Sequence, residues 1–68
     1  MNTNKNLYQI YDTVKDAYFS IGIDGKHRWL FSPEMAYTYS KDEAETLLKL
    51  LIKDWKYTDI IIVEYKKY

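Results

Sequence analysis

A zinc site or a Ser-His-Asp triad in this 68-residue chain would depend on one histidine, His27. The chain has no cysteine and no second histidine, so His27 lacks the partners that a zinc site requires. No serine lies in a nucleophile elbow, and two glycines alone do not make a phosphate-binding loop. We therefore predict that the protein is not an enzyme and holds no metal or cofactor. His27 itself, which follows the Asp24-Gly25-Lys26 turn, is expected to be exposed.

Charged residues are balanced along the chain, and this balance argues against several kinds of partner. Ten basic and ten acidic residues give no net charge, whereas nucleic-acid-binding proteins usually carry a basic excess that contacts phosphates. The chain is also not acidic enough to imitate DNA by charge. The carboxylates of Asp42 and Glu43 stand in the first turn of a predicted helix, where they complement the helix dipole. We therefore do not expect nucleic acid to be the main partner.

Aromatic residues make up 18% of the chain, with eight tyrosines, two tryptophans and two phenylalanines. The core of so small a domain cannot bury them all, so some tyrosines must lie at the surface. Surface tyrosines are enriched where proteins recognise partners. Tyrosine also suits half-buried positions of strands, so a purely structural explanation stays open.

The segment Ser40-Lys41-Asp42-Glu43-Ala44 predicts the start of a helix. A serine three residues before a glutamate forms a capping box, in which each side chain bonds the backbone N–H of the other residue. Apolar residues then recur at helical spacing along one stripe, which comprises Ala44, Leu47, Leu48, Leu51, Ile52 and Trp55. We expect an amphipathic helix over about Lys41 to Asp54.

Several segments have the composition of β-strands. Alternation is clearest over Ala17 to Ile23, whose odd positions are all apolar, so that face is predicted to be buried. Asp24-Gly25 predicts a two-residue type I′ hairpin turn, and Lys15-Asp16 predicts a weaker turn. Ser32-Pro33 ends the third strand. The predicted strands are Leu7 to Val14, Ala17 to Ile23, Lys26 to Phe31 and Ile60 to Tyr65, with a further short strand at Ala36 to Tyr39 as an option.

These elements predict an α+β fold: a two-layer domain with an antiparallel sheet of three to five strands and one helix on one face, in the order β-β-β-(β)-α-β. Residues 7–68 should form this single domain, and the polar residues 1–6 are expected to be a disordered N-terminal arm. No apolar run is long enough for a membrane span or a signal peptide. Small size without disulfides favours a cytoplasmic protein.

One helix covers one face of a sheet, so the other face should be open to a partner. Alternation places Tyr11 and Tyr18 on the open face, and the charge of Glu64 suggests that Ile60 and Ile62 point outward with it. A partly apolar patch with tyrosine and arginine is typical of an interaction site, although an ordinary half-hydrated face is the alternative. Two copies could also pair through the sheet edge or this face. The predicted partner-binding residues are Tyr11, Tyr18, Arg28, Leu30, Ile60 and Ile62.

The segment Ala36-Tyr37-Thr38-Tyr39-Ser40-Lys41-Asp42-Glu43-Ala44 resembles a pattern in many small phage and mobile-element proteins, most of them uncharacterised. In these proteins an Ala, two spacers, an aromatic and a Ser or Thr precede a helix that carries Glu-Ala. A β-hairpin comes before the pattern, and a hydrophobic strand such as Ile60 to Tyr65 comes after it. Small phage proteins often inhibit host machinery, including anti-CRISPR and other anti-defence proteins. The resemblance therefore implies a stoichiometric inhibitor, and it transfers no site residue because the motif is structural.

Three functions are consistent with this sequence. The first is a small phage-type protein that binds and inhibits a host protein, for example an antiphage defence complex such as CRISPR-Cas. The second is a single-stranded nucleic-acid binding module that uses Arg28, Trp29 and tyrosines. The third is a small-molecule sponge, in which a cleft between two copies sequesters a nucleotide signal.

Overall fold

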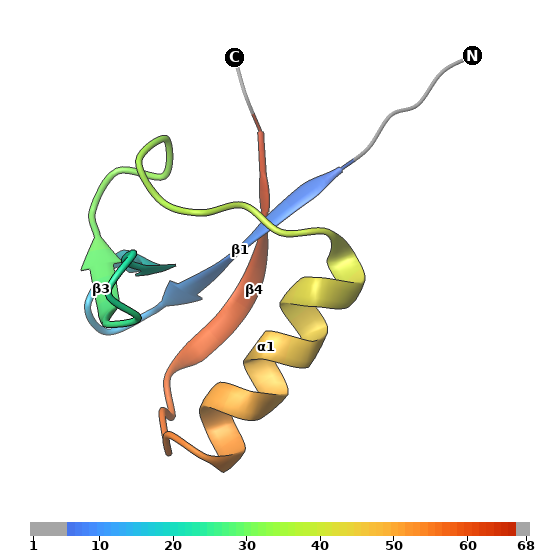
Figure 1. Ribbon diagram of the computed structural model, residues 1–68. Coiled ribbons are helices and arrows are strands. Elements are labelled where there is room, and N and C mark those ends of the chain that lie inside the picture. Colours follow the sequence, from blue (N-terminus) through green and yellow to red (C-terminus); the bar gives the residue numbers. More distant parts are fainter. Residues whose placement is uncertain (1–5, 67–68) are drawn as a thin grey trace.

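The computed structural model describes residues 6–66 and shows a four-stranded antiparallel sheet with one helix packed on it (Figure 1). The predicted α+β class and the order β-β-β-α-β are confirmed. The predicted disordered arm falls mainly on residues 1–5, which lie outside the described residues. The elements are β1 (Leu7–Asp12), β2 (Ala17–Ile21), β3 (His27–Leu30), α1 (Lys41–Lys53) and β4 (Ile60–Tyr65).

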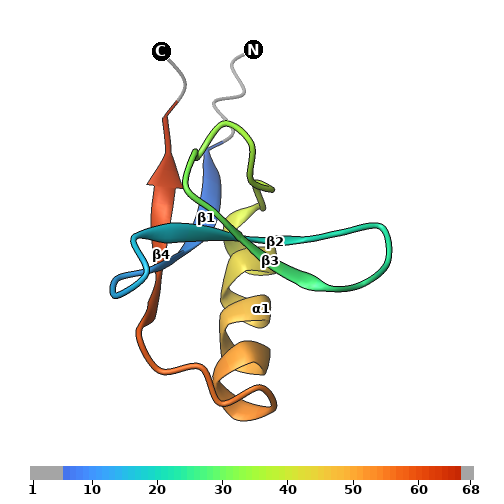
Figure 2. The same cartoon turned by 90° about the vertical axis from the view of Figure 1, so that its left-hand side faces the viewer.

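The strands lie in the order β3-β2-β1-β4, so the last strand of the chain is at one edge of the sheet. β1 pairs with β4 along its whole length, from Leu7 opposite Tyr65 to Asp12 opposite Ile60. β2 pairs with β1 only at Tyr11 and Asp12. The β2–β3 hairpin therefore swings away and crosses β1 and β4 at a steep angle (Figure 2).

The segment that leads into α1 completes the N-terminal half of β1. Tyr8 and Tyr39 exchange two backbone hydrogen bonds of 2.8 Å, and these form an isolated bridge. The chain forms a turn just before this bridge. The Met35 N–H donates to the Ser32 carbonyl at 3.1 Å, and the Ala36 N–H donates to the Pro33 carbonyl at 3.4 Å, so Ala36 belongs to the turn and not to a strand. The optional short strand at Ala36 to Tyr39 is therefore reduced to one bridged residue.

The predicted capping box at the start of α1 is confirmed. Ser40 Oγ accepts a 3.2 Å hydrogen bond from the Glu43 N–H, and the Glu43 carboxylate accepts a 3.1 Å bond from the Ser40 N–H. Ala44 and Leu51 are the buried residues of the helix, as the stripe predicts. The predicted stripe is too long, because Ile52 lies to its side and Trp55 follows the end of the helix, and both are about half exposed.

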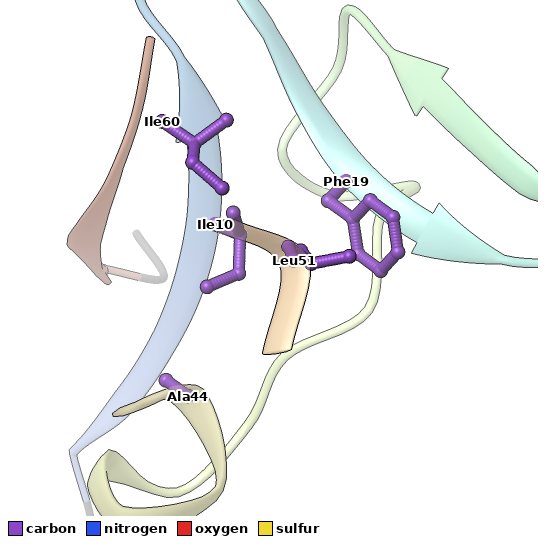
Figure 3. Packing of buried hydrophobic residues seen from close by; sticks show 5 residues of the cluster. All are labelled: Ile10, Phe19, Ala44, Leu51 and Ile60. Carbon is purple, nitrogen blue, oxygen red and sulfur yellow. The ribbon is translucent and has the colours of Figure 1, made fainter. Parts of the chain in front are cut away.

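The core lies between α1 and one face of the sheet. The inward placement of Ala17 and Phe19 on β2 is confirmed, because both side chains are buried. Figure 3 shows the five buried members of the core cluster, which are Ile10, Phe19, Ala44, Leu51 and Ile60.

The predicted outward placement of Ile60 and Ile62 is wrong. Ile60 is only 6% exposed within the core, and Ile62 packs against the same cluster. The register explains this, because Ile62 lies opposite Ile10 and therefore shares its face of the sheet. Glu64 shares that face as well, but it lies near the end of β4 and is exposed. A charge at a strand end was therefore a poor guide to the direction of the whole strand.

The chain leaves β1 at Asp12, earlier than the predicted strand end at Val14. The Asp12 carboxylate accepts hydrogen bonds from the N–H groups of Val14 and Lys15, at 2.9 and 2.8 Å. Burial opposes ionisation of Asp12, but these N–H donors and the Lys15 ammonium outweigh it, so the pKa of Asp12 is lowered. Asp16 completes the turn with a φ of 56°.

The β2–β3 turn has three residues rather than the predicted two. The Gly22 N–H donates to the Lys26 carbonyl, and the Gly25 N–H donates to the Gly22 carbonyl, both at 2.9 Å. Gly25 has a φ of 80°, as the left-handed position of a three-residue hairpin loop requires. The predicted type I′ turn is wrong, because it needs a positive φ at Asp24 too. Ile23 lies on this loop and is exposed, contrary to its predicted burial.

Aromatic rings join the β2–β3 hairpin to the segment that follows α1. The ring centroids of His27 and Trp55 lie 4.2 Å apart, and His27 Nδ1 is 3.0 Å from the Tyr57 hydroxyl. Trp29 meets Tyr57 edge to face at 5.5 Å and Phe19 at 5.4 Å. The predicted exposure of His27 is therefore wrong, because these contacts leave its ring only partly exposed.

Candidate functional site

A hollow of about 290 Å³ opens on the face of the sheet that α1 leaves uncovered. Three tyrosines line it, one each from β1, β2 and β4, and the segment after β3 adds a proline. Four separate parts of the chain therefore meet at this site. We call it the tyrosine hollow, and it is lined by Gln9, Tyr11, Tyr18, Pro33, Val63, Glu64, Tyr65 and Lys66.

Two tyrosines form a ring pair in the hollow. The register of the strands places Tyr11 directly opposite Tyr18, with ring centroids 5.0 Å apart and a tilt of 46°. The Tyr11 hydroxyl donates a hydrogen bond to the Asp16 carboxylate in the adjoining turn. This bond, together with burial and the Asp16 charge, raises the pKa of Tyr11 to about 12. Tyr11 is therefore held in one orientation and stays protonated at neutral pH.

Gln9 holds Pro33 in place at the wall of the hollow. It points away from α1, yet it is only 1% exposed. Its Nε2 donates a 2.7 Å hydrogen bond to the Pro33 carbonyl, which supplies the partner that a buried amide needs. With the Tyr8–Tyr39 bridge, this bond fastens the 32–39 segment to β1 at two points. The hollow is therefore formed before any partner arrives.

Charged residues of both signs lie at the tyrosine hollow and in the hairpin beside it. Glu64 and Lys66 line the β4 side of the hollow. Arg28 does not line it, and its guanidinium pairs with the Asp24 carboxylate at 3.1 Å. Gly22 makes room for this pair, because a Cβ at that position would lie 2.7 Å from Arg28 Nε. The positive charge of Arg28 is therefore partly neutralised within its own hairpin.

The structure brings together part of the predicted site. Tyr11 and Tyr18 line the hollow, and Leu30 lies directly opposite Tyr18 on β3. Arg28 shares their face but lies opposite Ser20, farther along the hairpin. The two predicted isoleucines of β4 lie on the core face instead. The binding role of the remaining residues stays a prediction.

The residues that sequence reasoning missed come from β4 and from the loop. Val63 and Tyr65 line the hollow in place of the predicted isoleucines of the same strand. A row of isoleucines and valine shows no alternation, but the tyrosine at the parity of Val63 was a usable signal for the outward face. No local signal indicates that Pro33 would fold over Gln9, because that contact joins distant parts of the chain.

A second, apolar groove of about 580 Å³ lies between the end of β2 and α1, next to the core face. It is lined in part by Ile21, Leu47 and Leu50, and Tyr39 borders it. Burial, with the nearby Tyr37 and Glu43, raises the pKa of Tyr39 to about 12. The carboxylates at this groove belong to the first turn of α1, where the helix start explains them.

Neither metal ligands nor relatives identify the site. Within residues 6–66, no three His, Cys, Asp or Glu side chains are grouped so that they could hold a metal ion. No helix in the described range is long and apolar enough to cross a membrane. Comparison with known protein families, characterised proteins and solved structures gave no match. The geometry of the hollow is therefore the main indication of function.

Proposed function

We propose that this protein binds a partner protein through the tyrosine hollow and the helix-free face around it. The observation that carries the proposal is the meeting of Tyr11, Tyr18 and Tyr65 around one preformed hollow. Tyrosine offers a large apolar surface and a polar tip at low cost in side-chain entropy, which explains its enrichment at interfaces. Binding would block the partner surface that the protein covers, so the expected effect is stoichiometric inhibition.

The size of the hollow favours a protein side chain over a small molecule. Pockets for drug-sized ligands commonly measure about 300–1,000 Å³. The tyrosine hollow, at about 290 Å³, lies just below that range. Such a space suits one or two anchoring side chains of a partner, and it gives a single copy little room for a nucleotide signal.

The resemblance to small phage proteins is the reason to seek the partner among bacterial host proteins. An antiphage defence complex, such as CRISPR-Cas, is the target that this resemblance favours. The protein would then act in the host cytoplasm. Its zero net charge fits blocking by shape rather than imitation of DNA.

A single-stranded nucleic-acid binding module is the second candidate, and the Tyr11–Tyr18 pair is the observation that favours it. Bases stack on accessible aromatic rings, and both of these rings are partly exposed. The predicted stacking platform of Arg28 and Trp29 does not form, because Trp29 lies opposite Phe19 and packs on the core side. This candidate therefore ranks second.

A pull-down from nuclease-treated bacterial lysate tests the proposal with two matched variants. Tyr18→Ala removes a ring of the hollow, whereas Tyr37→Ala removes an exposed ring outside it. We expect one protein to be retained by the wild type and by Tyr37→Ala, to be lost with Tyr18→Ala, and to resist moderate salt. Loss on nuclease treatment with steep salt dependence would favour nucleic acid. Equal retention by both variants would show that the hollow is not the binding site.

A further inference from the structure

The two edges of the sheet differ in how well they are protected. β3 forms one edge with four residues and carries the exposed Arg28. β4 forms the other edge with six mostly apolar residues, and Figure 2 shows it as the outer strand beside β1. Proteins commonly protect an edge with a short strand or with charged residues. β3 has both protections, whereas β4 has only Glu64 near its end.

The hydrogen bonds of β4 determine which of its backbone groups are free. The Thr13 N–H donates to the Asp59 carbonyl at 2.8 Å, which makes these residues a hydrogen-bonded pair at the end of the β1–β4 ladder. Bonded and non-bonded pairs alternate in an antiparallel ladder. Ile61, Val63 and Tyr65 therefore direct their N–H and C=O groups to β1. The intervening residues 60, 62 and 64 direct theirs away from the sheet.

We propose that this edge pairs antiparallel with β4 of a second copy, so that the two sheets join into one. Ile62 lies opposite Ile62 of the copy in this arrangement, and Ile60 lies opposite Glu64. The free backbone groups of residues 60, 62 and 64 in each copy then bond those of the other. The recognised partner is therefore a second β4 strand, and the proposal does not depend on the function proposed above.

Charges on the strand favour a second copy in this antiparallel register. A parallel pair would place the two Glu64 carboxylates side by side, and like charges in such positions destabilise a sheet. The antiparallel register separates them. It also places Lys66 across from Thr58 of the copy and next to Asp59, so opposite charges meet at both ends of the shared ladder. Zero net charge means that the copies do not repel each other overall.

Apolar contacts support the same pairing. Ile61 is 47% exposed, although it belongs to a strand rich in isoleucine. In this register it lies opposite Val63 of the copy, and β-branched pairs across strands stabilise a sheet. The two-fold axis of such a pair is perpendicular to the sheet, so both tyrosine hollows face the same side. A partner with repeated surfaces could then occupy both at once.

Sedimentation velocity over a wide range of protein concentration tests the pairing. We expect a monomer–dimer equilibrium for the full chain. Ile61→Lys places a charge in the shared ladder and should weaken dimerisation by about tenfold or more, which corresponds to about 1.4 kcal/mol. The matched control is Ile52→Lys on α1, because Ile52 is also 47% exposed. It should dimerise like the wild type.

Amide hydrogen exchange measured by NMR locates the interface at single residues. The N–H groups of Ile62 and Glu64 should become protected as concentration rises, whereas those of Ile61 and Val63 should be protected at every concentration. Glu64→Pro removes one edge donor and leaves the β1 ladder intact, so it should be monomeric. Glu64→Ala keeps the donor and should still dimerise.

Three outcomes would overturn the proposal. The first is a protein that stays monomeric at all concentrations. The second is a dimer that forms through another surface, shown by Ile62 and Glu64 amides that still exchange freely or by an Ile52→Lys variant that is weakened as much as Ile61→Lys. The third is protection of the edge amides only when a foreign extended peptide is added to a monomer, which would assign the edge to a strand of another protein.

Discussion

The two faces of the sheet bury their side chains by different means. On the covered face, Ile10 and Phe19 pack against the apolar stripe of α1. On the helix-free face, Gln9 is buried as fully, but beneath the loop segment around Pro33. Its side-chain amide donates a hydrogen bond to the Pro33 carbonyl. β1 serves both faces through alternate residues. The difference indicates that the covered face provides most of the stability, whereas the helix-free face keeps polar and aromatic groups that a partner can use.

The largest loss of stability should come from removing a buried ring on the covered face. Phe19→Ala removes a fully buried ring, and such changes cost about 3–5 kcal/mol. Since a domain of this size has only a few kcal/mol of stability, the variant should be largely unfolded. Urea titration followed by circular dichroism measures the loss. Phe31→Ala, at an exposed position, is the control, and an equal loss there would refute the assignment of the core.

A buried charge on the covered face should give the next largest effect. Asp12→Ala removes the acceptor for two N–H groups, which should cost about 1.5–3 kcal/mol. The folded pKa of Asp12 is lowered, so its contribution is present above its unfolded pKa of about 4 and is lost as pH falls through the folded pKa. The urea midpoints of wild type and variant should differ at neutral pH and converge at strongly acidic pH. Parallel pH curves would contradict this account.

Loss of the hydrogen bond between Gln9 and Pro33 should lower the stability slightly less. Gln9→Met keeps the length of the side chain but leaves the Pro33 carbonyl without its donor, at a cost of about 1–3 kcal/mol. The variant should also bind the partner more weakly, because Pro33 would no longer be fixed at the wall of the hollow. Urea titration and the pull-down measure the two effects. Full stability with full binding would show that this bond does not shape the hollow.

The smallest stability effect should come from the hollow itself. Tyr18→Ala removes the ring contact with Tyr11, a pair worth about 0.5–1.5 kcal/mol, and should weaken partner binding far more than folding. Thermal denaturation beside the pull-down separates the two effects, with Tyr37→Ala as the comparison. A large fall in thermal stability would mean that Tyr18 belongs to the core rather than to the recognition surface.

Local signals predicted the parts of the fold that a few neighbouring residues determine. The Ser40–Glu43 capping box and the burial of Ala17 and Phe19 depend on sequence spacing alone, and both are confirmed. The β2–β3 turn was predicted only in part. The positive φ that a type I′ turn requires at Gly25 is confirmed, but the number of loop residues depends on where Gly22 and Lys26 pair.

Long-range contacts determine what the sequence could not reveal. The direction of the β4 side chains follows from the pairing of Ile62 with Ile10, far apart in the chain, and three consecutive isoleucines contain no alternation to indicate it. The tyrosine hollow needs four separate segments to meet. The predicted placement of Tyr11 and Tyr18 on the helix-free face is confirmed, because it follows from alternation along their own strands. Sequence reasoning could not find Pro33, whose position depends on the path of a loop.

The pairing of β1 with β4 determines when the tyrosine hollow can form during protein synthesis. The central ladder joins Leu7 to Tyr65, so it spans almost the whole described chain. Contacts so distant in sequence form slowly because loop closure costs entropy. A nascent chain that still lacks Ile60–Tyr65 has neither the edge strand nor one wall of the hollow. We expect it to stay unstructured on the ribosome and to form the proposed binding surface only after β4 has been synthesised.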